Sequence, residues 1–172
     1  LFKYSELCFL KAIAIELGLV SGDAKSEYEA GVRSSMTELG VPESNIVSYL
    51  ASTSPNYYGT TASYDDITGT SNTALDKILT QKYIAQFQEC SFETWADHRQ
   101  FHKPTLMPFA SVSSSVFNMN PSDQANNTPN AYIKRIYYPS SEYTVNATNV
   151  KEAESRMGGN NSIQNNVWWD VN

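Results

Sequence analysis

The sequence predicts a mainly α-helical fold in which helical hairpins are joined by long irregular loops. Apolar residues recur at helical spacing through much of residues 1–106, the pattern of helices that bury one face. Gly40 and Pro42 follow one such stretch and are typical of a helix end, because Gly accepts the left-handed conformation and Pro cannot continue a helix. Residues 107–130 are rich in Ser and Asn and lack such a period, so we expect residues 107–172 to form a loop-rich segment and a C-terminal tail.

The first expected helix covers residues 2–18 and is apolar around its whole circumference. Its charged side chains do not gather on one face; they are Lys3, Glu6, Lys11 and Glu16. A helix of this kind must be covered on several sides, and its charges argue against a membrane span. We therefore expect other helices to bury it, including neighbours from a longer protein of which this chain is a piece.

A second helix is expected over residues 24–39, with Asp23 as its N-cap. Its inner stripe has helical spacing and consists of Ala24, Tyr28, Gly31, Val32, Met36 and Leu39. The two helices then form an antiparallel hairpin. Its small residues, with Ala12 on the first helix, fall near the positions of tetratricopeptide repeats, although many helical hairpins share this pattern. A shorter helix, about 43–51, should follow.

A polar loop is expected over residues 52–72, and it carries Tyr57, Tyr58 and Tyr64. A loop of this length is usually either functional or mobile. The next helix is expected over residues 73–90. The residues on its inner side are Leu75, Ile78, Leu79, Tyr83, Phe87 and Cys90.

A short helix is expected between Ser91, which can cap it, and Pro104, which ends it. It carries His98 and His102 at i, i+4 spacing, which could place two imidazoles on one metal ion. No defined third ligand is visible in the sequence. We therefore expect solvated histidines at a helix end and no metal site.

The C-terminal part is expected to be mostly irregular. Residues 132–138 should be extended, residues 139–142 should form a turn, and residues 149–157 could form one short helix. Trp168 and Trp169 near the end are expected to pin the tail to the body of the protein.

Composition and charge argue against several functions. The net charge is −6 and the cations are scattered, whereas phosphate binding needs a clustered basic face, so we expect no nucleic-acid partner. Cys8 and Cys90 lie in apolar surroundings and should be buried thiols; a disulfide would need backbone geometry that a sequence does not show. Asp65 and Asp66 are adjacent and by themselves cannot flank a glycosidic bond, so we expect turn-forming residues.

Four segments, taken in order, resemble the SusD/RagB family. Residues 28–36 resemble its Y-x2-GI-x2-SM helix, and residues 80–106 its TQK-[WY]-IA-x-F helix, E-x-W-x-x-x-R element and P-x-L sequence. Residues 135–150 are similar to its R-x-x-YP-x-x-E and N-x-x-N segment, and WWD at residues 168–170 to its common ending. The motif residues for which we expect structural roles are Tyr83, Trp95, Arg99, Pro139 and Glu142.

The resemblance implies a fold, a location and a function. Residues 1–172 would be the C-terminal part of a single domain built on tetratricopeptide-like hairpins. The parent protein would be held at the outer surface of the outer membrane by an N-terminal lipid anchor outside this chain. It would bind an oligosaccharide, or in some members a peptide, above a SusC-like TonB-dependent transporter, without catalysis or a cofactor.

Aromatic side chains in the polar loops are the candidate ligand-binding residues. Sugar capture needs flat aromatic faces for C–H surfaces, and the candidates are Tyr57, Tyr58, Tyr64, Phe109 and Phe117. The alternative is that these rings anchor their loops to the helical body. Two other functional classes stay open: a tetratricopeptide-like protein–protein scaffold, and a glycoside hydrolase, which would need two facing carboxylates.

Overall fold

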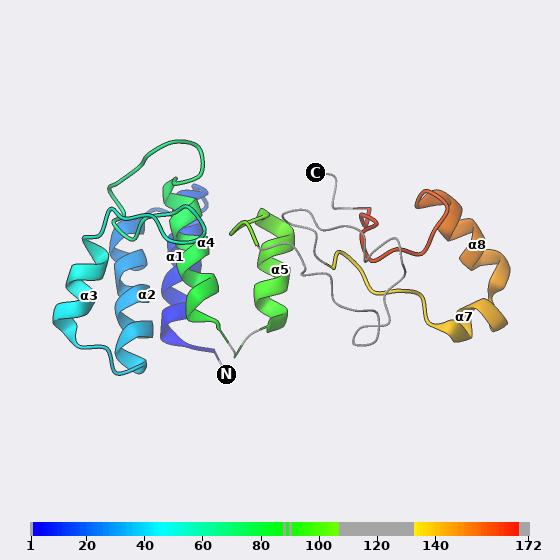
Figure 1. The fold of residues 1–172 in the computed structure, drawn as a ribbon, viewed down its shortest axis with the longest axis horizontal. Coiled ribbons are helices and arrows are strands. Elements are labelled where there is room, and N and C mark those ends of the chain that lie inside the picture. The colour runs from blue at the N-terminus through cyan, green and yellow to red at the C-terminus, as the bar shows by residue number, and fades with distance from the viewer. Residues whose placement is uncertain (1, 88, 90, 107–132, 169–172) are drawn as a thin grey trace. The chain divides into compact units, whose positions relative to one another are not determined.

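The computed structural model describes residues 2–87, 89, 91–106 and 133–168. These residues contain seven helices and no strand (Figure 1), so the predicted mainly α-helical fold is confirmed. They fall into two compact units, Leu1–Pro104 and Thr105–Asn172. Several sequence predictions lie outside the described residues, namely those for Cys90, Phe109, Phe117, Trp169 and the loop at 107–130.

The first unit opens with the expected hairpin of α1 (Tyr4–Glu16) and α2 (Ala24–Glu38). The Asp23 side chain caps α2 by accepting a hydrogen bond from the backbone N–H of Ser26 at 3.2 Å, which confirms the predicted cap. Gly40 follows α2 with a φ of 76°. The predicted helix end is therefore present, in the left-handed conformation that Gly adopts without steric cost.

A tight apolar contact holds the hairpin together. The core consists of Phe9, Ala12, Ile13, Tyr28, Val32, Ile78 and Leu79. A Cβ atom built on Gly31 would lie 2.9 Å from ring atoms of Phe9. Gly31 therefore lets the two helix backbones approach as closely as the tetratricopeptide-like pattern predicted.

The outer side of α1 is exposed within the described residues, at Tyr4, Leu7 and Leu10. Helix α1 contacts α2 and α4 (Ala74–Ala85), and its expected burial by further helices of a longer protein stays a prediction. Cys8 is buried, as predicted. Leu39 was assigned to the inner stripe of α2 but is exposed, because α2 ends at Glu38.

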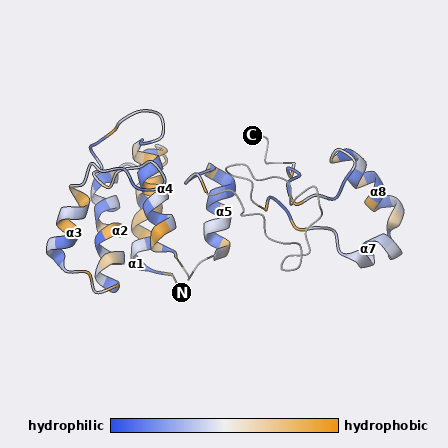
Figure 2. Cartoon of the chain, in the orientation of Figure 1, coloured by the Kyte–Doolittle hydropathy of each residue, from blue (hydrophilic) through white to orange (hydrophobic). Residues whose placement is uncertain are grey.

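A loop of residues 51–73 joins α3 (Glu43–Leu50) to α4 (Ala74–Ala85). Figure 2 shows this loop mostly in pale to blue colours, in keeping with its polar composition. Helix α4 ends earlier than the predicted residue 90. Phe87 consequently lies beyond the helix and is 73% exposed instead of facing inward.

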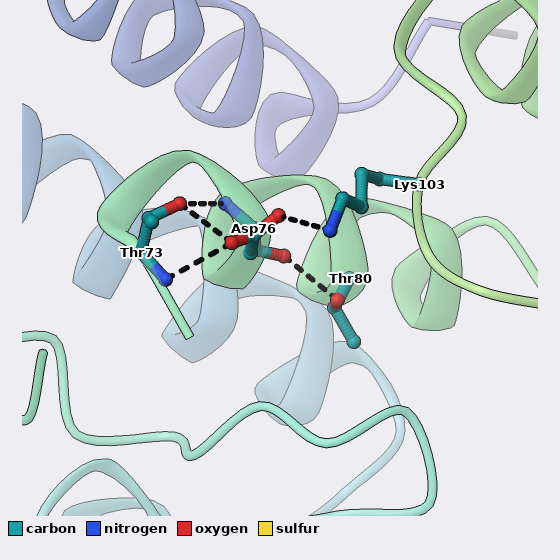
Figure 3. A network of polar contacts seen from close by, with 4 residues as sticks. All are labelled: Thr73, Asp76, Thr80 and Lys103. Atoms are coloured by element: carbon teal, nitrogen blue, oxygen red, sulfur yellow. Dashed lines mark hydrogen bonds and ion pairs between the residues drawn. The ribbon is translucent and has the colours of Figure 1, made fainter. Parts of the chain in front are cut away.

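Helix α4 starts with a capping box, drawn in Figure 3. The Asp76 carboxylate accepts hydrogen bonds from the backbone N–H of Thr73 at 3.0 Å and from its hydroxyl at 2.7 Å, and it pairs with Lys103 at 3.0 Å. Burial by itself would raise the pKa of Asp76, but the hydrogen bonds from Thr73 and Lys103 outweigh it and lower that pKa. The segment after α5 is thereby tied to the start of α4.

Helix α5 (Ser91–Phe101) begins at Ser91 itself, so Ser91 is its first residue and not a preceding cap. Lys82 of α4 forms an ion pair with Asp97 of α5. His98 is only 2% exposed, so the prediction of a solvated histidine is wrong at this position. Burial lowers the pKa of His98, since the charged imidazolium is disfavoured away from water.

The second unit contains α7 (Ser140–Val145) and α8 (Ala147–Arg156). The predicted short helix is α8, but the predicted turn at 139–142 is wrong, because Pro139 is the N-cap of α7. A Pro before a helix is well tolerated, since its missing N–H is not needed there. Trp168 is 89% exposed among the described residues, and its expected contact with the body of the protein stays a prediction.

Candidate functional site

The α3–α4 loop, residues 51–73, carries three of the predicted ligand-binding tyrosines, and we call it the tyrosine loop. The structure separates these tyrosines into two groups. Tyr57 and Tyr58 lie with Tyr83 of α4, whereas Tyr64 packs on α2. The two groups have different surroundings and hence differ in whether they can contact a ligand or anchor the loop.

The first group is a row of three rings. Tyr57 and Tyr58 meet edge to face with their centroids 5.5 Å apart, and Tyr58 meets Tyr83 in the same way at 5.6 Å. Tyr57 is 69% exposed and Tyr58 is half-buried. Burial, followed by the nearby Tyr83, raises the pKa of Tyr58. The row therefore offers an outer ring that is backed by inner rings, an arrangement that limits its movement.

Tyr64 anchors the tyrosine loop to the helical hairpin. Its ring lies 5.4 Å from that of Tyr28, and its hydroxyl donates a hydrogen bond to Glu16. The Tyr28 hydroxyl in turn donates to the carbonyl oxygen of Ala62 at 2.8 Å. Burial raises the pKa of both phenols. This geometry favours the anchoring alternative for Tyr64, while its role in ligand binding stays a prediction.

A buried lysine holds the middle of the tyrosine loop. The ammonium group of Lys77 is fully buried and donates hydrogen bonds to the carbonyl oxygens of Thr61 at 3.3 Å and Ser63 at 2.8 Å. It also donates to the Thr61 hydroxyl. Burial lowers the pKa of Lys77, and the Asp66 carboxylate acts in the opposite direction. The sequence analysis missed Lys77, because a lone Lys in a helix is usually exposed.

Asn72 braces the same loop at its C-terminal end. Its amide oxygen accepts from the backbone N–H of Thr61 at 2.9 Å, and its amide nitrogen donates to the carbonyl oxygen of Asp66 at 2.7 Å and to the Thr68 hydroxyl at 3.0 Å. Asn72 is buried, so these contacts replace the water that the backbone would otherwise bind. The only sequence signal for it is an Asn just before a helix cap.

The braced loop forms an open hollow of about 450 Å³. This volume lies within the range of about 300–1,000 Å³ that is usual for small-molecule sites. Five of its ten lining residues carry a hydroxyl group: Thr53, Thr61, Thr68, Thr70 and Ser71. Asp66 and the ring of Pro55 also line it. Sequence reasoning did not find this hollow.

The predicted structural motif residues occupy three places, of which the row with Tyr83 has been described. Arg99 is buried, and its guanidinium lies 4.8 Å from the centre of the Trp95 ring, one turn away on α5. In the second unit, Pro139 caps α7 and Glu142 accepts a hydrogen bond from the Asn146 side chain at 3.2 Å. The structural roles expected for these residues stay predictions.

In the part of the chain that the structure describes, no group of three or more His, Cys, Asp or Glu side chains could hold a metal ion. Likewise, none of the described helices has both the length and the apolar composition that a membrane crossing requires.

Comparison with known proteins gives one family and several solved structures. A family model described as "SusD-like: Susd and RagB outer membrane lipoprotein" matches residues 1–170. A SusD homolog from Parabacteroides distasonis is 41% identical with a TM-score of 0.80; the match covers 100% of this chain and 33% of that one. A chitin-binding SusD homolog from Flavobacterium johnsoniae is 29% identical with a TM-score of 0.72, covering 100% and 36%.

A third structure, a SusD homolog from Bacteroides vulgatus, is 25% identical with a TM-score of 0.68 and a coverage of 97% and 34%. The chain therefore spans about a third of the length of the solved structures it resembles. None of the curated proteins that were compared matches it.

Proposed function

The chain belongs to the SusD/RagB family of outer-membrane lipoproteins, and we propose that its parent protein captures an oligosaccharide for a SusC-like TonB-dependent transporter. Members of this family are non-catalytic binding proteins. The observation that carries the proposal is the match of the family model to residues 1–170. A glycan ligand is favoured over a peptide because a homolog of 29% identity is chitin-binding.

Within this chain, the Tyr57–Tyr58–Tyr83 row is the proposed contact for sugar. The exposed face of Tyr57 can receive the C–H surface of a sugar ring, and the edge-to-face contact with Tyr58 holds it in place. Because the ring is already ordered, binding loses less conformational entropy than it would with an isolated surface tyrosine. We therefore assign the tyrosine loop to the ligand-binding surface.

The test is a panel of ligands whose binding to the intact protein is compared between the wild type and the tyrosine variants. The panel contains hexasaccharides of glucose, N-acetylglucosamine, xylose, mannose and galacturonic acid, together with short peptides, and binding is measured by calorimetry. We expect saturable glycan binding without hydrolysis. Replacing Tyr57 with Ala should weaken that binding by roughly tenfold, the loss expected for one aromatic contact of about 1–2 kcal/mol.

Tyr143 provides a matched control, because it is a partly exposed tyrosine of the second unit outside the tyrosine loop. Tyr143→Ala should leave the affinity unchanged. Binding of peptides alone, or release of shorter sugars, would contradict the proposal. The transporter is tested separately: an affinity-tagged copy of the intact protein, isolated from its own outer membrane, should bring a TonB-dependent transporter with it.

A further inference from the structure

The two adjacent carboxylates of the tyrosine loop have different surroundings. Asp65 forms an ion pair with Lys25 of α2 and does not line the hollow. Asp66 lines the hollow, and among the residues that the structure describes it takes part in no ion pair. A turn-forming role accounts for the backbone positions of both residues, but it does not explain why only Asp65 of the two is ion-paired among the described residues.

The hollow that Asp66 lines has a hydrogen-bonded wall. Its wall includes Thr61 and Asn72, which are both buried and hydrogen-bonded to each other. Lys77 holds Thr61 from behind. Thr61 is thus held by both Asn72 and Lys77 without a ligand, and a preformed wall lowers the entropic cost of binding.

The chemistry of the wall selects a class of ligand. Hydroxyl groups both donate and accept hydrogen bonds, whereas an ionised carboxylate only accepts them. The ammonium groups of two nearby lysines already have partners: buried Lys77 donates its hydrogen bonds to Thr61 and Ser63, and Lys25 pairs with Asp65. An uncharged polyhydroxyl ligand therefore finds acceptors and donors here, but an anionic one meets a like charge.

We propose that the hollow is a subsite for an uncharged sugar, and that Asp66 is the residue that discriminates against acidic sugars. The carboxylate accepts hydrogen bonds from sugar hydroxyls and repels a uronic acid. This inference rests on the proposed function, because it assumes that the intact protein binds a glycan, and it adds which glycans are admitted and by which residue.

Two pairs of variants test the subsite in the intact protein. Asp66→Asn keeps the size of the side chain but removes its charge, and Asp65→Asn is the matched control on the adjacent carboxylate. Thr70→Trp fills the hollow from its exposed rim, and Thr37→Trp is the matched control at an exposed position of α2. The probes are the neutral hexasaccharides of the panel and the galacturonic acid hexamer.

The wild-type protein should bind a neutral hexasaccharide at least tenfold more tightly than the galacturonic acid hexamer. Asp66→Asn should lower the affinity for the neutral hexasaccharide by about tenfold, which is the usual loss for a hydrogen bond to a charged group. It should also reduce the ratio between the affinities for the neutral and the acidic hexasaccharide. Thr70→Trp should abolish most of the neutral binding. Both control variants should behave like the wild type.

The possible results separate this inference from the proposed function. If Tyr57→Ala weakens glycan binding but Asp66→Asn and Thr70→Trp do not, the subsite is overturned and the proposed function stands. If Thr70→Trp weakens glycan binding but Asp66→Asn does not, the assignment of Asp66 is overturned. The same holds if the wild-type protein binds the acidic hexamer more tightly than the neutral one. If no hexasaccharide binds, both the function and the subsite are wrong.

Discussion

Phe9 of α1 packs against Gly31 of α2 across an apolar interface, whereas the tyrosine loop turns its carbonyl oxygens toward the ammonium group of Lys77. Both regions belong to the first unit and share Tyr28, whose ring lies in the apolar core and whose hydroxyl bonds the loop. The hairpin needs the correct volume in its core. The loop needs every buried polar group to find a partner.

The difference shows why the loop can carry a binding site. An apolar interface is formed by any side chains of the right size and tolerates volume-conserving changes. A polar brace specifies one arrangement, since a single missing partner leaves a buried group unsatisfied. The tyrosine loop thereby gains a defined hollow without a core of its own. Four substitutions test this contrast.

The largest effect is expected for Lys77→Met in the polar brace. The substitution keeps an unbranched side chain but leaves the carbonyl oxygens of Thr61 and Ser63 without their donor. We expect a loss of about 3 kcal/mol in the free energy of unfolding, measured by urea denaturation of the intact protein. Hydrogen exchange in residues 60–63 should accelerate more than exchange in α1.

Lys25→Met is the control, since Lys25 contacts the same loop from an exposed position through Asp65. An exposed ion pair contributes little to stability, so Lys25→Met should leave the urea midpoint unchanged. Equal effects of the two lysine variants would show that the buried brace is not what orders the loop.

The next effect is expected for Gly31→Ala in the hairpin. The new methyl group would lie 2.9 Å from the Phe9 ring, so the ring or the helices must shift. Overpacking of this kind costs about 2 kcal/mol, and urea denaturation should show it. Combining Gly31→Ala with Phe9→Leu should restore part of the loss, because the smaller side chain makes room. No restoration in the double variant would contradict the proposed packing.

A smaller effect is expected where the two regions meet. Tyr28→Phe keeps the ring in the core but leaves the buried carbonyl oxygen of Ala62 without its 2.8 Å hydrogen bond. The expected loss is about 1.5 kcal/mol, together with faster hydrogen exchange in the tyrosine loop and unchanged exchange in α2. Tyr57→Phe, at an exposed ring, should change neither quantity.

The smallest effect is expected at the start of α4, and it depends on pH. The pKa of Asp76 is lowered in the folded protein, so its stabilising contribution is complete above the unfolded-state pKa and is lost as pH falls through the folded-state value. Asp76→Asn should destabilise the protein by about 1 kcal/mol at pH 7. The difference from the wild type should shrink below about pH 4; a difference that stays constant into acid would contradict this account.

The positions of the helices could be predicted from the sequence where apolar spacing and caps coincide. Asp23 caps α2, Gly40 ends it in the left-handed conformation, and Gly31 leaves room for the Phe9 ring, each as predicted from its residue type. Predictions failed where an element ended early or a Pro preceded a helix, as at Phe87 and Pro139. Periodicity does not indicate where a helix stops when no Gly or Pro marks its end.

The candidate site was predictable only in part. Tyr57, Tyr58 and Tyr64 could be selected because aromatic side chains in a polar loop are unusual, but their separation into an exposed row and an anchor depends on Tyr83 and Tyr28 in other helices. The hollow could not be predicted at all. Its wall consists of common residues, and only their arrangement around Asn72 makes it a cavity.

By itself, the sequence determined the helical class, the hairpin and the family, because helix period, capping and motif order are local properties of the chain. The tertiary structure alone decided which polar groups are buried and what they bind. Lys77 and His98 resemble surface residues in the sequence, and Asp65 and Asp66 are chemically identical neighbours. Their different roles come from contacts with residues distant in the chain, which fix the solvation and the partner of each charge.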